Sequence, residues 1–439
     1  MMEQDQELLI QLVSALRGSN ERHVSHLVNM IRSHASLQEI REYITDHLKL
    51  GTIEDTSEVT EFRRQIGFLL DVEGPAFESR KAQRVAHPRS LNVPAKPWTV
   101  IQCNNATYTF GNNHLARVYE GRMVDALRNF STSKASASPN PSGNEQQYDN
   151  VCSIAIWGVY NILLGNLITY QRQPPIEVPQ CARPLVFHVD GLAGEQWVPY
   201  PNSQPATTSH ESCLINSLCN LTPIVNDICL LLSQGWKYLS PEVVDQSVEA
   251  LFKRLEDWKA HVPSCMRLSD TERSSPQVLG THVYYHIILI SLYGFSQKFC
   301  GSVRMSNTST LSNARARAMR LHAAQDVARL IELRRRLWGL DRIAAPVSQW
   351  ITISLLTLLE DLSTPESKEA FVSLCVALRV SARRWEYSKG LLRLTQHLAL
   401  QSCLALPPET TPLYRDFQDL EWGPEDDERF GALAQWFRM

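Results

Sequence analysis

The residues best suited to chemistry are two histidines, His282 and His286, in the run THVYYHIILISLYGF at 281–295. On a helix their four-residue spacing places both imidazoles on one face, as in helical metal sites. The glutamate that acts as general base in such sites is missing, and no second motif supplies a third ligand. Histidines in an apolar helix commonly form hydrogen bonds within the core. We therefore expect no metal here or elsewhere.

A second candidate group is His188 with Asp190, a base with its orienting carboxylate, and Cys152 or Ser153 as the nucleophile. No motif fixes these residues together. The chain also has no nucleophile elbow, no phosphate-binding glycine loop and no dinucleotide-binding fingerprint. We therefore assign no catalytic residue and expect no cofactor, while noting that a pericyclic reaction needs only an apolar pocket.

Aromatic and histidine side chains on the two most apolar stretches form a candidate ligand pocket. Trp157 and Tyr160 lie in the first stretch, and His282, Tyr285 and His286 lie in the second. Aromatic residues of this kind can line a cavity or fill a core. We predict a small-molecule pocket at these five residues, with plain core packing as the alternative.

The elements that carry these residues are two helices, predicted at 148–171 and 277–298, whose only charged residues are Asp149 and Lys298. A helix that is apolar on every side must be buried on every side, so we predict that the two helices pack against each other. Each approaches the ~20 apolar residues that span a bilayer. Polar residues interrupt both helices and no cluster of Lys and Arg flanks them, so we expect core helices and no membrane contact.

Helical periodicity continues through most of the chain, and strand-like alternation is almost absent. The chain is predicted to be all-α, a multi-helix bundle with long irregular loops at 131–147, 176–211 and 300–312. Further helices are predicted at 113–130, 214–233, 241–261, 313–337, 346–362, 367–384 and 391–404.

The predicted domain organisation has two parts. Residues 1–50 form amphipathic helices, of which the third opens with a capping box at Ser36 and Glu39. Residues 51–439 form the large helical domain. Within it, 131–147 reads STSKASASPNPSGNEQQ, which lacks the apolar residues that offset ordering entropy, so we predict a flexible loop there.

Composition narrows the classes of protein. The chain has 439 residues, of which 44% are hydrophobic and 20% charged, as in ordinary globular proteins. Its net charge of −3 gives no overall field that attracts nucleic acid or anionic lipid. The arginines at 314–342 alternate with apolar residues, which favours a solvated helix face over a phosphate-binding strip. Ten cysteines without a C-x-x-C pair and an acidic N-terminus indicate the cytosol or nucleus.

The order of several motifs is similar to one known family. The stretch 27–40, LVNMIRSHASLQEI, resembles the leucine-rich stretch after the zinc cluster of fungal zinc-cluster transcription factors. The tryptophan helix around Trp157, the Arg-Gln-Pro-Pro turn at 172–175 and the histidine-tyrosine helix at 282–293 resemble that family's middle homology region. The resemblance covers roughly residues 20–400 and implies an all-α regulatory domain.

The resemblance implies a regulator of transcription in a fungal nucleus, connected with secondary metabolism. Its expected partners are a small-molecule effector and a protein partner or second copy of the chain. The family's DNA-binding module needs six cysteines in two C-x-x-C groups, which this chain lacks. Either this sequence begins after the cluster or the natural protein lost it, and we favour loss. We expect no sequence-specific DNA binding by this chain alone.

Two other functions remain open at this point. One is a biosynthetic enzyme of the cyclase or isomerase type that reuses the scaffold with an apolar pocket. The other is an interaction module that pairs with a full-length regulator through its N-terminal helices. A shared fold cannot choose among them, because function depends on the particular site.

Overall fold

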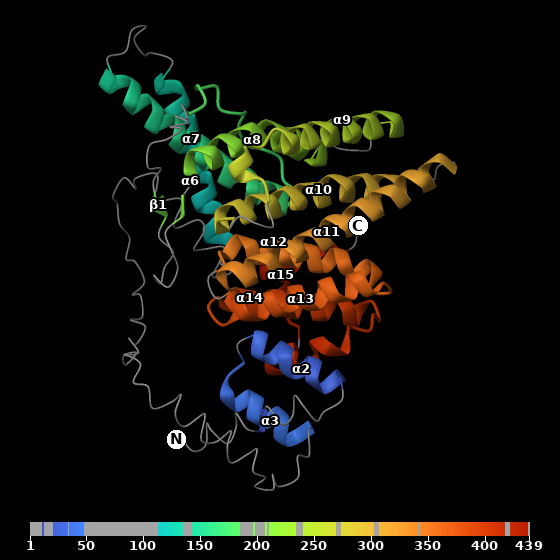
Figure 1. The fold of residues 1–439 in the computed structure, drawn as a ribbon. Coiled ribbons are helices and arrows are strands. Elements are labelled where there is room, and N and C mark those ends of the chain that lie inside the picture. Colours follow the sequence, from blue (N-terminus) through green and yellow to red (C-terminus); the bar gives the residue numbers. More distant parts are fainter. Residues whose placement is uncertain are drawn as a thin grey trace, which may run out of the picture. The chain divides into compact units, whose positions relative to one another are not determined.

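The computed structural model describes residues 11–12, 21–33, 35–47, 113–134, 143–184, 196–197, 207–208, 210–233, 240–268, 274–302, 307–340, 343–417 and 422–437. Over these residues helices dominate, which confirms the predicted all-α class. The chain forms two compact units (Figure 1). Unit 1 is Met1–Ala95 with Pro408–Asp416, and unit 2 is Lys96–Pro407 with Phe417–Met439.

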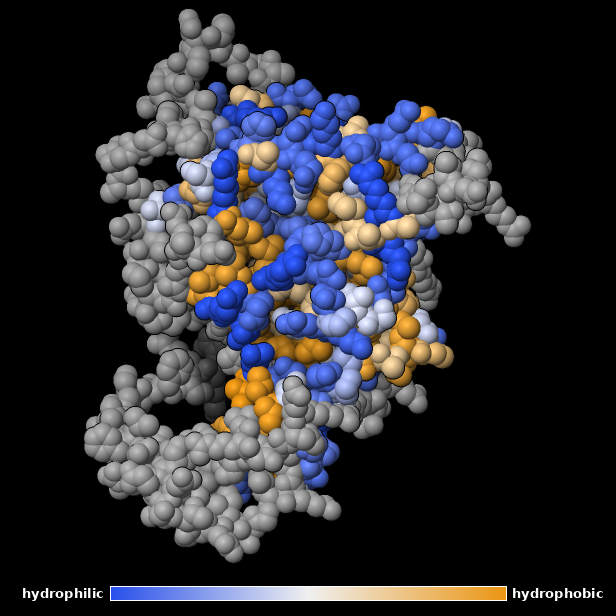
Figure 2. Space-filling view, turned by 45° about the vertical axis from the view of Figure 1, so that its right-hand side comes forward, coloured by the Kyte–Doolittle hydropathy of each residue, from blue (hydrophilic) through white to orange (hydrophobic). Residues whose placement is uncertain are grey.

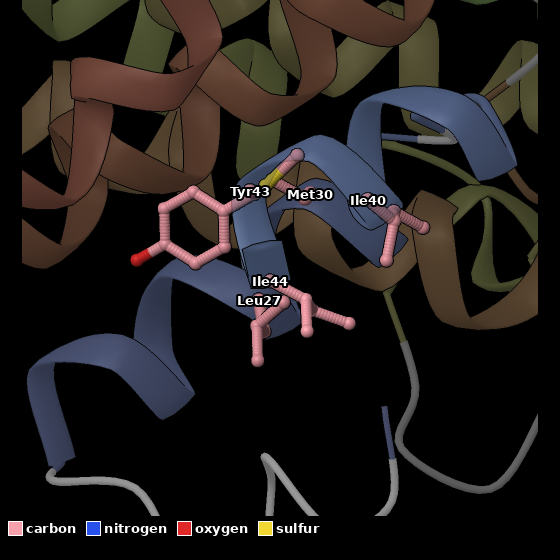
Figure 3. Close-up of a cluster of buried hydrophobic side chains, with 5 residues drawn as sticks. All are labelled: Leu27, Met30, Ile40, Tyr43 and Ile44. Carbon is pink, nitrogen blue, oxygen red and sulfur yellow. The ribbon is translucent and has the colours of Figure 1, made fainter. Parts of the chain in front are cut away.

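Unit 1 contains α2 (Glu21–Arg32), α3 (Leu37–His47) and, much later in the chain, all but the last residue of the 3₁₀ segment η4 (Pro408–Phe417). The predicted capping box is confirmed: the Ser36 N–H donates to the Glu39 carboxylate at 2.5 Å, and the Glu39 N–H donates to the Ser36 hydroxyl at 3.2 Å. Arg415 of η4 lies 3.3 Å from Asp46 of α3. The core of this unit contains buried side chains from both helices (Figure 3): Leu27, Met30, Ile40, Tyr43 and Ile44.

Unit 2 holds the remaining helices. Their bounds are α6 (Asn113–Lys134), α7 (Gly143–Thr169), α8 (Glu211–Ser233), α9 (Pro241–Ala260), η2 (Ser264–Met266), α10 (Pro276–Ser302), α11 (Asn307–Trp338), α12 (Ala345–Leu358), η3 (Leu359–Asp361), α13 (Pro365–Ala382), α14 (Glu386–Gln401) and α15 (Pro424–Ala434). Two short strands, β1 (Gln196–Trp197) and β2 (Thr207–Thr208), pair antiparallel, with Gln196 opposite Thr208. This pair lies within the segment 176–211 that we predicted to be irregular.

The helices of unit 2 pack mainly against their neighbours in the chain. Helix α8 contacts α7, α9 and α10, and α11 contacts α10, α12 and α13. Residues 281–296 of α10 are all buried, as expected for a helix without a charged side chain over this stretch. Two of the helices start at a hydroxyl cap followed by proline: Ser240 accepts from the N–H of Val243, and Thr364 accepts from the N–H of Ser367.

Two predicted loops are shorter than expected. Helix α10 continues to Ser302 and α11 begins at Asn307, so most of 300–312 is helical. Helices α6 and α7 likewise take in 131–134 and 143–147, and residues 135–142 lie outside the described ranges. A helix that has already formed gains one hydrogen bond for each residue it adds, so polar residues can extend it without an apolar face.

Three helices have the length and mean hydropathy to cross a membrane: Asp149–Thr169, Glu211–Ser233 and Pro276–Phe299. The apolar window of the third is 94% buried, and those of the first two are 50% and 56% buried. The face seen in Figure 2 is largely hydrophilic, with hydrophobic residues gathered in places between the polar ones. The packing of α10 inside unit 2 accounts for its apolar composition without a membrane.

Candidate functional site

The two predicted pocket residues of α7 are buried, and Tyr160 faces α8. The Tyr160 hydroxyl donates to Oδ1 of Asn226 at 2.8 Å, and burial raises the pKa of Tyr160. Trp157 is also buried, and the guanidinium of Arg183 lies 5.9 Å from the centre of its ring. Tyr160 therefore has a structural partner on the neighbouring helix.

The predicted residues of α10 also contact their neighbours closely. His282 donates from Nε2 to the carbonyl oxygen of Met266 at 2.8 Å. The Tyr285 hydroxyl donates to the Glu256 carboxylate at 2.8 Å, and its ring stacks on Trp258 with 5.7 Å between the ring centres. These contacts join α10 to α9 and to the turn that follows α9.

His286 is a buried imidazole beside a carboxylate. Its Nδ1 lies 3.5 Å from the carboxylate of Asp326 on α11. Burial lowers the pKa of His286 to about 4, although Asp326 acts in the opposite direction. Burial lowers the pKa of His282 as well. Both imidazoles are therefore neutral at neutral pH.

No group of three or more histidine, cysteine, aspartate or glutamate residues in the described part of the chain could hold a metal ion. Burial raises the pKa of the Cys219 and Cys229 thiols to about 11 and about 12, so both are protonated and unreactive at neutral pH. His188 and Asp190 of the candidate catalytic group lie outside the described residues.

The arginines of 314–342 are largely engaged by carboxylates. Arg315 lies 3.2 Å from Glu249, and Arg335 pairs with Glu332 on its own helix. Arg320 is fully buried and pairs with Glu360 at 2.8 Å. Sequence periodicity gave no indication of this buried pair. The exposed Arg315 agrees with the predicted solvated helix face, whereas the buried Arg320 does not.

The contacts of the predicted residues lead to different neighbouring helices, so a shared cavity between α7 and α10 stays a prediction. The two helices touch, but α8 makes a larger contact with each of them than they make with each other. Tyr160 therefore faces α8 from one direction, whereas Tyr285 stacks on α9. The sequence could not show that α8 contacts both helices, because contacts between helices distant in the chain are not a local property.

A cavity of about 360 Å³ opens between α8 and α9, within the size range of small-molecule sites. It is lined by Asn216, Ser217, Asn220, Ile224, Arg254, Asp257, Trp258, His261, Val262 and Pro263, a set that includes none of the five predicted residues.

Helical spacing explains how this lining assembles. On α8, Asn216, Asn220 and Ile224 follow one another at four-residue intervals and so share a face. On α9, Arg254 and Trp258 have the same spacing. The indole N–H of Trp258 donates to the Ser217 carbonyl oxygen at 2.9 Å and so joins the two helices.

One ion pair and one hydrogen bond hold polar side chains in place at the cavity. Arg254 lies 2.7 Å from the carboxylate of Asp227 on α8. Arg183 donates to Oδ1 of Asn220, which leaves the amide N–H groups of Asn220 for other partners.

Ser217 differs from these residues. It is 3% exposed, and its hydroxyl has no hydrogen-bond partner among the residues that the structure describes. A buried polar atom without a partner is uncommon in a folded protein. Asn216 and Asn220, four residues apart on α8, were the only sequence indication of this site, and Trp258 gave none.

Comparison with known proteins shows that the chain is similar to fungal regulators of transcription. It is 25% identical to the notoamide biosynthesis transcriptional activator notL' of Aspergillus versicolor, over 94% of this chain and 84% of that protein. It is 25% identical to the nitrogen assimilation transcription factor nirA of Emericella nidulans, over 58% of this chain and 29% of that protein. No protein-family model matches the chain. No solved structure matches it significantly. The two relatives confirm the resemblance to fungal transcription factors, and the enzyme alternative gains no support from them.

Proposed function

We propose that this chain, a relative of fungal transcriptional activators, is itself a regulator of transcription that acts in the nucleus and responds to a small-molecule effector through its helical body. The observation that carries the proposal is the extent of the similarity to a biosynthetic activator, which covers 94% of this chain. That span leaves little of the chain unrelated to the activator. The name of that relative also supports a role in secondary metabolism.

The cavity between α8 and α9 is the best candidate for the effector site. Its walls come from two helices that are joined by Trp258, and Trp258 also stacks on Tyr285 of the central helix α10. A molecule bound between two helices stabilises whichever arrangement of them it fits best. Binding at this cavity would therefore be transmitted to α10 through the Trp258–Tyr285 stack.

The charges of the chain support regulation through partners rather than direct reading of DNA. The net charge is −3, and arginines such as Arg315 and Arg335 are paired with carboxylates. A protein that binds DNA electrostatically needs unpaired cations along a surface. A protein partner or a second copy of this chain would then connect it to its target genes.

A tethering experiment tests the proposed function. The full chain is fused to a heterologous DNA-binding domain in a fungal host, and transcription of a reporter with the matching operator is measured. We expect a several-fold change relative to the DNA-binding domain alone, and a fluorescent fusion of the full chain in the nucleus. An unchanged reporter, together with an unchanged transcriptome after deletion of the gene, would contradict the proposal.

A further inference from the structure

We propose that the cavity between α8 and α9 binds a small uncharged molecule that bears amide groups and one apolar group, such as a blocked amino acid or a short peptide derivative. The regulatory meaning of such binding rests on the proposed function. Binding itself can be measured independently of any effect on transcription.

The part of the cavity wall that α8 contributes contains side chains that can donate and accept hydrogen bonds. The hydroxyl of Ser217 is buried at the cavity without a partner among the described residues, although leaving such a group unpaired costs free energy. Asn216 and Asn220, whose side chains end in amides, line the same cavity. An amide group both donates and accepts, so a ligand amide can pair with another amide and with a hydroxyl at the same time.

The charges at the cavity favour an uncharged ligand. The one arginine of the lining, Arg254, is held 2.7 Å from Asp227 and is thus already neutralised by a carboxylate. Asp257 adds a negative charge to the lining, which disfavours an anion. The buried lining residues Ser217 and Trp258 carry no charge, and an unpaired ion placed against them would lose its hydration.

The remaining wall is apolar. Ile224 lies on α8, and Val262 and Pro263 lie on the turn after α9. Trp258 contributes its ring but no donor, because its indole N–H is already bonded to the Ser217 carbonyl oxygen. An aliphatic side chain on the ligand would displace water from these surfaces, which is the main favourable term for small apolar groups.

The test uses N-acetyl-L-leucinamide, an uncharged molecule with two amides and one aliphatic side chain, and the full chain. Saturation-transfer NMR and titration calorimetry measure its binding. We expect a millimolar dissociation constant, ordinary for a molecule of this size. N-acetyl-L-leucine, an anion, and L-leucinamide, a cation, should bind several-fold more weakly. No binding of the uncharged probe, or tighter binding of either charged probe, would overturn the proposal.

Two matched variants locate the binding. Ser217→Ala removes the unpartnered hydroxyl and should weaken the probe about 2- to 10-fold, the usual effect of one hydrogen bond. Thr222→Val removes a hydroxyl from the other side of the same helix, where it is bonded to Asn161, and should leave the affinity unchanged. Equal affinity of Ser217→Ala and the unmodified chain would place the probe elsewhere and refute the proposed site.

The two proposals fail in different ways. Probe binding without any reporter response in the tethering experiment would leave the ligand class standing and contradict the regulatory function. A reporter response without probe binding would support the function and refute the ligand class. Circular dichroism of both variants verifies that they are folded before binding is compared.

Discussion

The two sides of α8 carry similar polar residues in opposite situations. On the side of α7, Thr222 donates to Asn161 at 2.6 Å and Asn226 accepts from Tyr160 at 2.8 Å. On the side of α9, Ser217 has no partner among the described residues and lines a cavity. The same kind of side chain is therefore bonded where it meets a neighbouring helix that offers a partner, and is left unpaired where the neighbour offers none.

The largest expected effect tests whether α9 depends on its contact with the core. Trp258→Ala removes a buried ring, its stack on Tyr285 and the hydrogen bond to Ser217. We expect the free energy of unfolding to fall by about 3–5 kcal/mol, as for other large aromatic truncations. Urea denaturation measures the loss. Trp258→Phe keeps a ring in place and should cost clearly less; an equal loss in both variants would contradict the role of the stack.

The stability of the protein should also fall in acid, because His286 is buried. Burial lowers the pKa of His286 to about 4, whereas an imidazole in the unfolded chain titrates near ~6.5. The unfolded chain thus binds the proton first as the pH falls, so stability is complete above ~6.5 and declines toward ~4, by up to about 3 kcal/mol. His286→Asn should flatten this decline in denaturation curves. His322→Asn, which removes an exposed histidine beside the same Asp326, should not.

A smaller loss in the free energy of unfolding is expected on the side of α8 that faces α7. Thr222→Val breaks the bond to Asn161 and leaves that amide oxygen without its donor. Removing one partner of a buried hydrogen bond costs about 1–3 kcal/mol, and the partial exposure of Asn161 places the expected loss near the lower value. Thermal unfolding followed by circular dichroism measures it. Unchanged stability would mean that water replaces the lost partner of Asn161 and therefore reaches this side of α8.

The smallest change in stability is expected on the side of α8 that faces α9. Ser217→Ala removes a hydroxyl that has no partner among the described residues, so the unliganded chain should change in stability by less than about 0.5 kcal/mol. Thermal unfolding followed by circular dichroism measures this change as well. A loss as large as that of Thr222→Val would show that the hydroxyl is already satisfied and would remove the distinction between the two sides.

The positions of the helices could largely be predicted from sequence, and the site could not. The prediction of a helix at 241–261 matches α9 (Pro241–Ala260), because proline at the first turn and the apolar period are local properties. The partners of the buried hydroxyls are not local: Tyr160 and Asn226 are 66 residues apart. The cavity arises where two such distant faces meet without filling the space between them, and no single helix encodes that outcome.

The position of Trp436 near the end of the chain limits when one buried contact of unit 2 can form. Its side chain is fully buried, and its indole N–H donates to the carbonyl oxygen of Thr169, 267 residues earlier. At synthesis rates of about 5–20 residues per second, the ribosome adds Trp436 roughly 13–50 s after Thr169. Until then the carbonyl oxygen of Thr169 lacks this donor, so this buried contact can form only after nearly the whole chain has been made.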